Sequence, residues 1–275
     1  MLRRVHHVGL VVRRLEDGLA FWKDRLGLEV SKQATVRDQG VRAALLPIGR
    51  SEIELLEPID ASGGVAKFLA RRGEGLHHVC FETPDVGAEL AAARAREFPL
   101  IDEAPRAGLA GMICFLHPKG TRGVLVEFAT PAPEDIHHPH AAGTRIPGLA
   151  LDEVVARSRD AESAATLFAD RLGLERASAG AAPGLVCAAV QTGGVRLVFA
   201  SADPRSVAPE AAAWSAALEE QGEGLSGLVL GAGDLSAAAA ALGPLAPAPD
   251  AGTLRLDPAH CHGVPIFIRL EKRPG

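Results

Sequence analysis

The sequence lacks the features of a membrane, nucleic-acid-binding or disulfide-rich protein. No stretch reaches the roughly 20 consecutive apolar residues of a membrane-spanning helix. The 29 Lys and Arg residues stand against 34 Asp and Glu, and no basic stripe offers a surface for nucleic acid. The four cysteines have no CxxC spacing, so we expect buried free thiols. These absences predict a globular protein with no nucleic-acid or membrane partner.

The N-terminal segment, MLRRVHHVGLVVRRLED, does not match a secretory signal peptide. Its apolar run is short, contains two histidines and is interrupted by Arg13 and Arg14. We therefore expect a cytoplasmic protein.

The chain of 275 residues contains an internal repeat. The motif DRLGLE occurs at 24–29 and at 170–175, and GEGL occurs at 73–76 and at 222–225. Between the two copies, residues 131–148 are rich in Pro, His and Gly and show no periodicity. The predicted organisation is a first domain over 1–130, a linker over 131–148 and a second domain over 149–275.

Each half is predicted to contain two βαβββ modules. In the first module, VHHVGLVV alternates like a strand, LEDGLAFWKDRLG has helical spacing, and extended segments follow at 28–36, 41–49 and 51–58. A short helix over 65–73 leads to a second strand and helix at 76–82 and 87–97. Strands near 99–101, at 111–118 and at 123–128 complete the half. The pattern predicts an α+β fold with four modules in the chain.

The paired modules, with a histidine in each first strand and a carboxylate in each last strand, resemble the vicinal oxygen chelate superfamily of glyoxalases and bleomycin-resistance proteins. The segments EIELLEP, VAKFLARRGEGLHHVCFE, LIDEAPRAGLAG and FLHPKGTRGVLVEF resemble methylmalonyl-CoA epimerases over residues 5–130. The second half resembles the superfamily's fold only. The resemblance implies two tandem vicinal-oxygen-chelate domains, the second of them degenerate.

The resemblance also implies a site for one divalent metal ion, with Co²⁺, Mn²⁺, Ni²⁺, Zn²⁺ and Mg²⁺ as candidates. The implied ligands are His7, Glu54, His78 and Glu127. Because neighbouring strand residues point to opposite faces, His6 and His77 are expected on the other face. An ionised Glu127 in an apolar strand is costly unless it is paired or coordinated. The four residues are therefore predicted as one metal site.

The second half is predicted to hold no such site. The repeat aligns the four ligand positions with Glu153, about Val198, Gly227 and Phe267, in that order. Three of the four have lost a ligand-type side chain. The second half is then a structural partner that stands in for a second protomer, and the protein is either a monomer with an internal pseudo-dimer or a homodimer.

The implied activity is epimerisation of a 2-substituted malonyl-CoA, methylmalonyl-CoA first, by removal of the α-proton through a metal-chelated enolate. Glu127 is predicted to act as acid and base as well as ligand. The second such group is Glu54, a water held by Gln39, or His117, since Ala43 stands where some family members have a carboxylate.

The loop HPKGTRG over 117–123 is predicted to contact the substrate. Lys119 and Arg122, with His117, would meet the CoA phosphates or the substrate carboxylate. A solvated turn is the alternative. The histidines of HHPH, at 137–140, and of HCH, at 260–262, are expected to be exposed loop residues.

Three other functions stay open. A glyoxalase-type isomerase, similar to lactoylglutathione lyase, shares the site and its chemistry. An extradiol ring-cleaving dioxygenase fits less well, because Glu54 would close a position needed for O₂ and the chain has no tyrosine. A non-enzymatic protein that binds a small ligand would need no metal.

Overall fold

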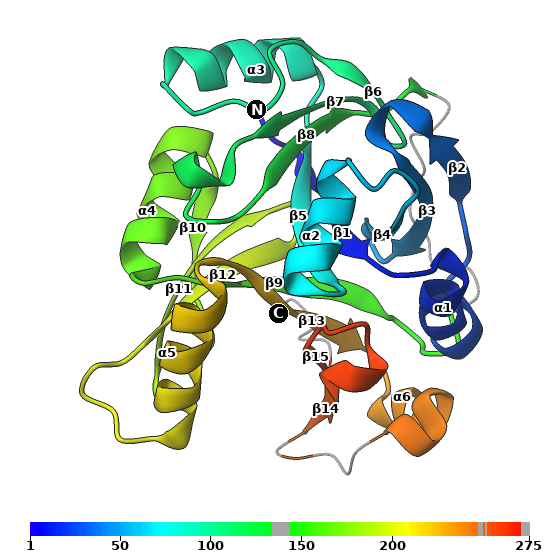
Figure 1. Cartoon of the computed structure of the whole chain (residues 1–275). Coiled ribbons are helices and arrows are strands. Elements are labelled where there is room, and N and C mark those ends of the chain that lie inside the picture. Colours follow the sequence, from blue (N-terminus) through cyan, green and yellow to red (C-terminus); the bar gives the residue numbers. More distant parts are fainter. Residues whose placement is uncertain (134–143, 247–249, 251, 271–275) are drawn as a thin grey trace. The chain divides into compact units, whose positions relative to one another are not determined.

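The computed structural model describes residues 1–133, 144–246, 250 and 252–270. Its strands form one sheet of eight and one of seven, and most helices lie against them (Figure 1). Among the described residues, no helix has the length and apolar character needed to cross a membrane. The predicted mixed α and β architecture is confirmed. The HHPH segment lies outside the described residues, as does most of the predicted linker.

The first half contains two modules joined by helix α2 (Gly64–Arg72). The first module runs through β1 (Arg4–Val11), α1 (Leu15–Leu19), the π-helix η1 (Ala20–Arg25), β2 (Lys32–Val36), η2 (Arg37–Gln39), β3 (Val41–Ile48) and β4 (Ser51–Pro58). The second runs through β5 (Gly75–Glu82), α3 (Val86–Ala95), β6 (Arg106–Gly108), β7 (Gly111–Leu116), η3 (Pro118–Gly120) and β8 (Val126–Thr130).

The second half repeats this order, with α5 (Pro209–Gln221) in place of α2. The third module runs through β9 (Ala150–Arg157), α4 (Ala161–Leu172), β10 (Glu175–Ala177), β11 (Leu185–Thr192) and β12 (Val195–Ala202). The fourth runs through β13 (Gly224–Ala232), α6 (Leu235–Leu242), η5 (Gly243–Leu245), β14 (Thr253–Leu256), η6 (Pro258–His260) and β15 (Ile266–Leu270). In the described part of this module, two strands follow the helix.

Two local predictions needed correction. The strand predicted near 99–101 is an isolated bridge between Leu100 and Leu116, and the paired strand is β6. The ladder is interrupted because the Asp102 carboxylate accepts the Phe115 N–H, at 2.9 Å, in place of a backbone carbonyl. The helix predicted from residue 15 widens into the π-helix, where Leu26 N–H donates to Phe21 O.

The chain forms two compact units that do not coincide with its two halves. Unit 1 comprises Met1–Val5, His78–Asp135 and Glu153–Ser226, and unit 2 comprises His6–His77, Ile136–Asp152 and Gly227–Gly275. Unit 1 therefore contains most of the second and third modules, and unit 2 contains most of the first and fourth. Within each unit, a module from one half packs with a module from the other. The predicted domain boundaries stay a prediction.

The repeated DRLGLE motif makes an equivalent contact in each unit. In unit 2, Arg25 Nη1 donates to the carbonyl of Leu242, the last residue of α6, at 2.8 Å. In unit 1, Arg171 donates to the carbonyl of Arg96, the C-cap of α3. A cation at a helix C-terminus satisfies carbonyls that have no intrahelical partner. In both copies, the arginine of this motif thus joins a module of one half to a module of the other.

The repeated GEGL motif is also structural. The Glu74 carboxylate accepts Arg13 N–H at 2.7 Å, and Glu223 accepts Arg159 N–H at 3.0 Å. The backbone carbonyls of the same two glutamates lie against Gly263 and Gly123, whose φ angles are +76° and +77°. A Cβ at either glycine would collide with that carbonyl. The glutamate thus joins a turn of its own half to a loop of the other half.

The cysteine prediction is confirmed in its main point, because all four are free. Cys80, Cys114 and Cys261 are buried, whereas Cys187 is half-buried. Burial raises the pKa of the Cys114 and Cys261 thiols to about 12. These two thiols are therefore protonated at neutral pH and chemically unreactive.

Candidate metal-binding site

The first predicted pair of ligands lies in unit 2, on the neighbouring parallel strands β1 and β4. The register sets His7 opposite Glu52 and Gly9 opposite Glu54. The side chains of His7, Glu52 and Glu54 therefore share one face. His7 Nε2 is 3.5 Å from Glu54 Oε2. The His7 side chain is fully buried and that of Glu54 is 9% exposed. One imidazole nitrogen and one carboxylate oxygen therefore meet away from bulk water.

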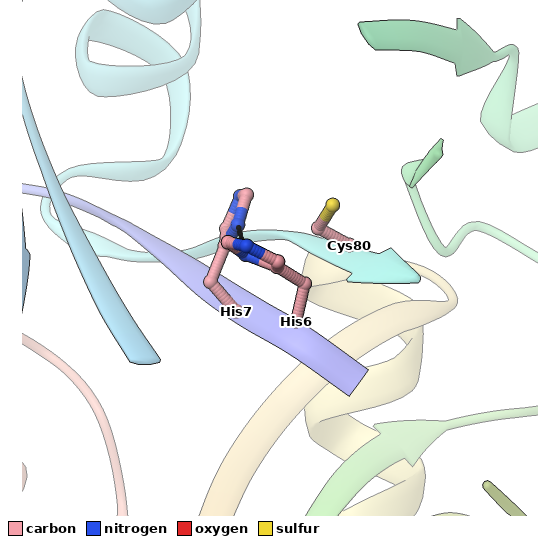
Figure 2. A group of neighbouring side chains, drawn as sticks. All are labelled: His6, His7 and Cys80. Atoms are coloured by element: carbon pink, nitrogen blue, oxygen red, sulfur yellow. Dashed lines mark hydrogen bonds between the residues drawn. The ribbon is translucent and has the colours of Figure 1, made fainter. Parts of the chain in front are cut away.

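The neighbouring His6 takes part in this arrangement, contrary to the prediction from strand alternation. Figure 2 shows the two rings approaching each other from adjacent positions on β1. Their Nδ1 atoms are 2.9 Å apart, and the rings meet edge to face with centroids 5.1 Å apart. The two imidazoles therefore lie together, although the residues are neighbours on one strand.

The second predicted pair lies in unit 1, on the parallel strands β5 and β8. Cys80 is opposite Glu127 in the register, and His78 shares the face of Cys80. His78 Nε2 is 3.0 Å from Glu127 Oε2, and both side chains are buried. The Phe115 ring packs against the His78 imidazole, with centroids 5.4 Å apart and planes at 83°. The Phe115 ring thus orients the His78 imidazole. The contact of Glu127 with His78 lowers the desolvation cost of the buried carboxylate.

The register of the second half matches the alignment drawn from the sequence. In unit 1, β12 pairs with β9 so that Arg196 is opposite Glu153, as Glu52 is opposite His7. In unit 2, β13 pairs with β15 so that Val229 is opposite Phe267, as Cys80 is opposite Glu127. The counterparts of Glu54, His78 and Glu127 are therefore Val198, Gly227 and Phe267.

The one ligand-type residue left in these positions, Glu153, is in a salt bridge. Its Oε1 accepts from Nη2 and Nε of Arg196, at 2.6 and 3.0 Å. Such a pair neutralises the carboxylate within the protein. At these four positions, an ion pair and apolar residues have replaced the donor set of the first half.

Arg106 is a potential site residue that sequence reasoning missed. The register places it opposite Ile113 on β7, on the face that also carries Phe115 and Glu127. Its Nε donates to Asp102 Oδ1 at 2.9 Å, and its guanidinium lies 5.5 Å from the centroid of Phe115. The side chain is one-third exposed. Both charged residues belong to LIDEAPRAGLAG, so their i,i+4 spacing was the available signal.

The predicted substrate loop is only partly available to a ligand. His117 Nδ1 accepts the Lys119 N–H at 3.1 Å and so begins the η3 turn. Lys119 is exposed, but Arg122 Nη2 donates to Ser163 Oγ at 2.7 Å, within unit 1. Arg122 thus holds a module of the first half to one of the second. Substrate contact by these residues stays a prediction.

The residues of both pairs fit a divalent metal ion. Each pair presents one imidazole nitrogen and one carboxylate oxygen, and this N/O set suits first-row divalent ions better than it suits Ca²⁺. No thiolate belongs to either pair, so a structural zinc site of the cysteine type does not match. The donor types therefore suit such an ion, and the set of four ligands stays a prediction.

Comparison with known proteins agrees with this fold. The model of the glyoxalase/bleomycin resistance protein/dioxygenase superfamily matches residues 6–115. Human mitochondrial methylmalonyl-CoA epimerase is 34% identical over 128 residues, which are 46% of this chain and 73% of that protein. The ethylmalonyl-CoA/methylmalonyl-CoA epimerase of Cereibacter sphaeroides is 36% identical over 46% of this chain and 97% of its own.

A match over the whole chain was found with a solved structure. It is a triple mutant of 4-hydroxymandelate synthase from Streptomyces coelicolor, with a TM-score of 0.73 over 100% of this chain and 94% of its own. At 15% identity, this likeness concerns the fold alone. It confirms the predicted tandem fold, and the relatives of the first half identify the family. The chain belongs to the glyoxalase/bleomycin resistance protein/dioxygenase superfamily.

Proposed function

We propose that the protein is a divalent-metal-dependent epimerase of 2-substituted malonyl-CoA thioesters, with methylmalonyl-CoA as the first substrate to test. The observation that carries the proposal is the pair of buried imidazole–carboxylate contacts, His7–Glu54 and His78–Glu127, at equivalent strand positions of the first two modules. Relatives named as epimerases cover about half of this chain. In the described part of the second half, the equivalent positions hold Glu153, which is paired with Arg196, and Val198, Gly227 and Phe267.

In this proposal, the four side chains hold one divalent ion. When bound, the ion polarises the thioester carbonyl as a Lewis acid. Glu127 accepts the α-proton on its carboxylate, and the burial of that carboxylate keeps competing water away. His78 holds Glu127 in place, while the Phe115 ring limits rotation of the imidazole.

A second group returns a proton to the opposite side of the α-carbon, so the reaction exchanges one proton and has no redox step. Ala43 cannot supply it, although the register places it on the same face as Glu54. Glu54 is the first candidate for this role because its carboxylate is buried beside His7. A water held by Gln39, and His117, are the alternatives.

Anion recognition falls to Arg106 and Lys119. Arg106 lies on the face of the sheet that carries Glu127, and the Asp102 carboxylate fixes its direction. A guanidinium suits a carboxylate or a phosphate. The malonyl group has a carboxylate near the reacting centre, and the CoA carrier has phosphates. Lys119 is exposed on the loop that precedes β8.

We also propose that the second half acts as an internal partner of the first. The proposed location of the protein is the cytoplasm.

The test is proton NMR of (2R,S)-methylmalonyl-CoA in D₂O with metal-loaded protein. We expect rapid loss of the α-proton signal, with chelator abolishing it and His78→Ala reducing it to the spontaneous rate. His77→Ala is the matched control on the same strand and should keep the activity. Wild-type protein that binds metal but leaves the signal at the spontaneous rate would refute the epimerase proposal. The glyoxalase-type hemithioacetal would then be the next substrate to test.

A further inference from the structure

The contact between His6 and His7 has a consequence for metal binding. Two imidazoles that share a hydrogen bond between Nδ1 atoms, here 2.9 Å apart, need a proton on one atom and a lone pair on the other (Figure 2). If His6 donates, neutral His7 carries its proton on Nε2 and cannot bind a metal there. If His7 donates, its Nε2 has a lone pair, and this is the nitrogen that faces Glu54.

We propose that His6 is a positioning residue that holds His7 in the Nδ1–H tautomer, with Nε2 as the metal ligand. This inference rests on the proposed metal site. Metal-ligating histidines need a partner for their second ring nitrogen, because it sets the tautomer and the ring orientation. Carboxylates, backbone carbonyls and waters are the usual partners. Here the partner is the imidazole of the preceding residue.

The surroundings of His6 keep its ring in place. The side chain is buried, and the edge-to-face angle of 86° directs its Nδ1 at the His7 ring. Glu52 Oε2 lies 3.7 Å from the same nitrogen, beyond hydrogen-bond distance, so His7 is the closer partner. The other oxygen of Glu52 accepts from Ser31 Oγ at 3.2 Å, which holds the carboxylate beside His6.

The equivalent histidine of the second module provides a matched comparison. His77 precedes His78 on β5 as His6 precedes His7 on β1. Its ring packs edge to face on Phe68, with centroids 5.0 Å apart. His78 takes its orientation from the Phe115 ring. The proposal therefore applies to the first histidine pair and predicts no effect on metal binding for the second.

The experiment compares four variants of the full chain: His6→Phe, His6→Asn, His77→Phe and His77→Asn. Phenylalanine keeps a ring but removes the acceptor, whereas the Asn Oδ1 provides an acceptor at the place of Nδ1. Zn²⁺ affinity is measured by competition with a chromogenic chelator. We expect His6→Phe to weaken binding about 10- to 100-fold, His6→Asn to restore it to within a few-fold, and both His77 variants to match the wild type.

A spectroscopic readout separates positioning from a loss of packing. In the Zn²⁺-loaded wild type, long-range ¹H–¹⁵N correlations of the histidine rings should show His7 protonated at Nδ1 and metal-bound at Nε2. Metal on His7 Nδ1 would overturn the inference, as would His6→Phe with wild-type affinity. Equal losses in His6→Phe and His6→Asn would assign His6 a packing role and also overturn it.

Failure of the metal site itself gives a different result. If the wild type takes up no ion and His7→Ala changes nothing, the proposed site is wrong and the inference is wrong with it. If the wild type binds one ion that requires His7, but the His6 variants keep the affinity and the tautomer, only the inference fails.

Discussion

Replacing Gly123 by alanine tests whether the repeated GEGL motif packs the two halves together. The φ angle of Gly123 is +77°, a conformation that costs an L-residue about 1–2 kcal/mol. The new Cβ would also collide with the backbone carbonyl of Glu223, which cannot rotate away as a side chain can. Overpacking of this kind costs about 1–3 kcal/mol more. We expect Gly123→Ala to lower the free energy of unfolding by about 2–5 kcal/mol.

Gly173 provides the matched control in the same unit. Its φ angle is +71°, and no described atom lies within 4 Å of the place of its Cβ. Gly173→Ala should therefore cost only the conformational part, about 1–2 kcal/mol. Urea denaturation with linear extrapolation measures both losses. Equal losses at the two glycines would show that the approach to Glu223 contributes nothing and would refute the reasoning.

Three further predictions concern the candidate site and the buried thiols. Glu127→Gln keeps the shape but removes the ionised carboxylate, and α-proton exchange should fall about 10²–10⁴-fold; a rate within threefold of wild type would contradict its role. Arg106→Met should raise KM for the CoA thioester about 10- to 100-fold with little change in kcat, as expected for one lost charged hydrogen bond; an effect on kcat alone would contradict an anion contact. For Cys114 and Cys261, burial raises the pKa from 9.0 to about 12. Unfolded thiols therefore lose their protons first, and stability should fall as pH rises from about 9 towards 12, by at most about 1.4 kcal/mol per pH unit and thiol. Urea melts from pH 8 to 10 measure that slope, which should be smaller when both cysteines are replaced by alanine.

The sequence was informative where a feature repeats or alternates. The repeat aligned strands whose register the structure reproduces. Matching FLHPKGTRGVLVEF with RLDPAHCHGVPIFI identified Phe267 as the counterpart of Glu127, and the repeat placed the counterpart of Glu54 at about Val198. The alternation of VHHVGLVV and LHHVCFE predicted strands β1 and β5. The family resemblance selected His7 and His78, and the structure sets each of them beside a carboxylate. These features depend on near neighbours along the chain or on the repeat.

Contacts between distant segments were not predictable in this way. The first module packs with the fourth, and the second packs with the third, through contacts between segments far apart in the sequence, which no local pattern records. The Arg122 guanidinium donates to Ser163, which lies 41 residues further along the chain, and no local pattern indicates this contact. His6 was assigned to the opposite face because alternation describes Cβ directions, whereas the reach of an imidazole depends on its rotamer. Side-chain reach and module packing thus needed the structure.

The central proposal is that His7, Glu54, His78 and Glu127 serve one metal ion. The most direct test is the number of Co²⁺ or Zn²⁺ ions retained per chain, measured by elemental analysis after dialysis. The account predicts one ion for the wild type and close to none for either His7→Ala or His78→Ala, while His77→Ala keeps one. Two ions in the wild type, with each substitution removing only one, would show two separate sites and contradict the account.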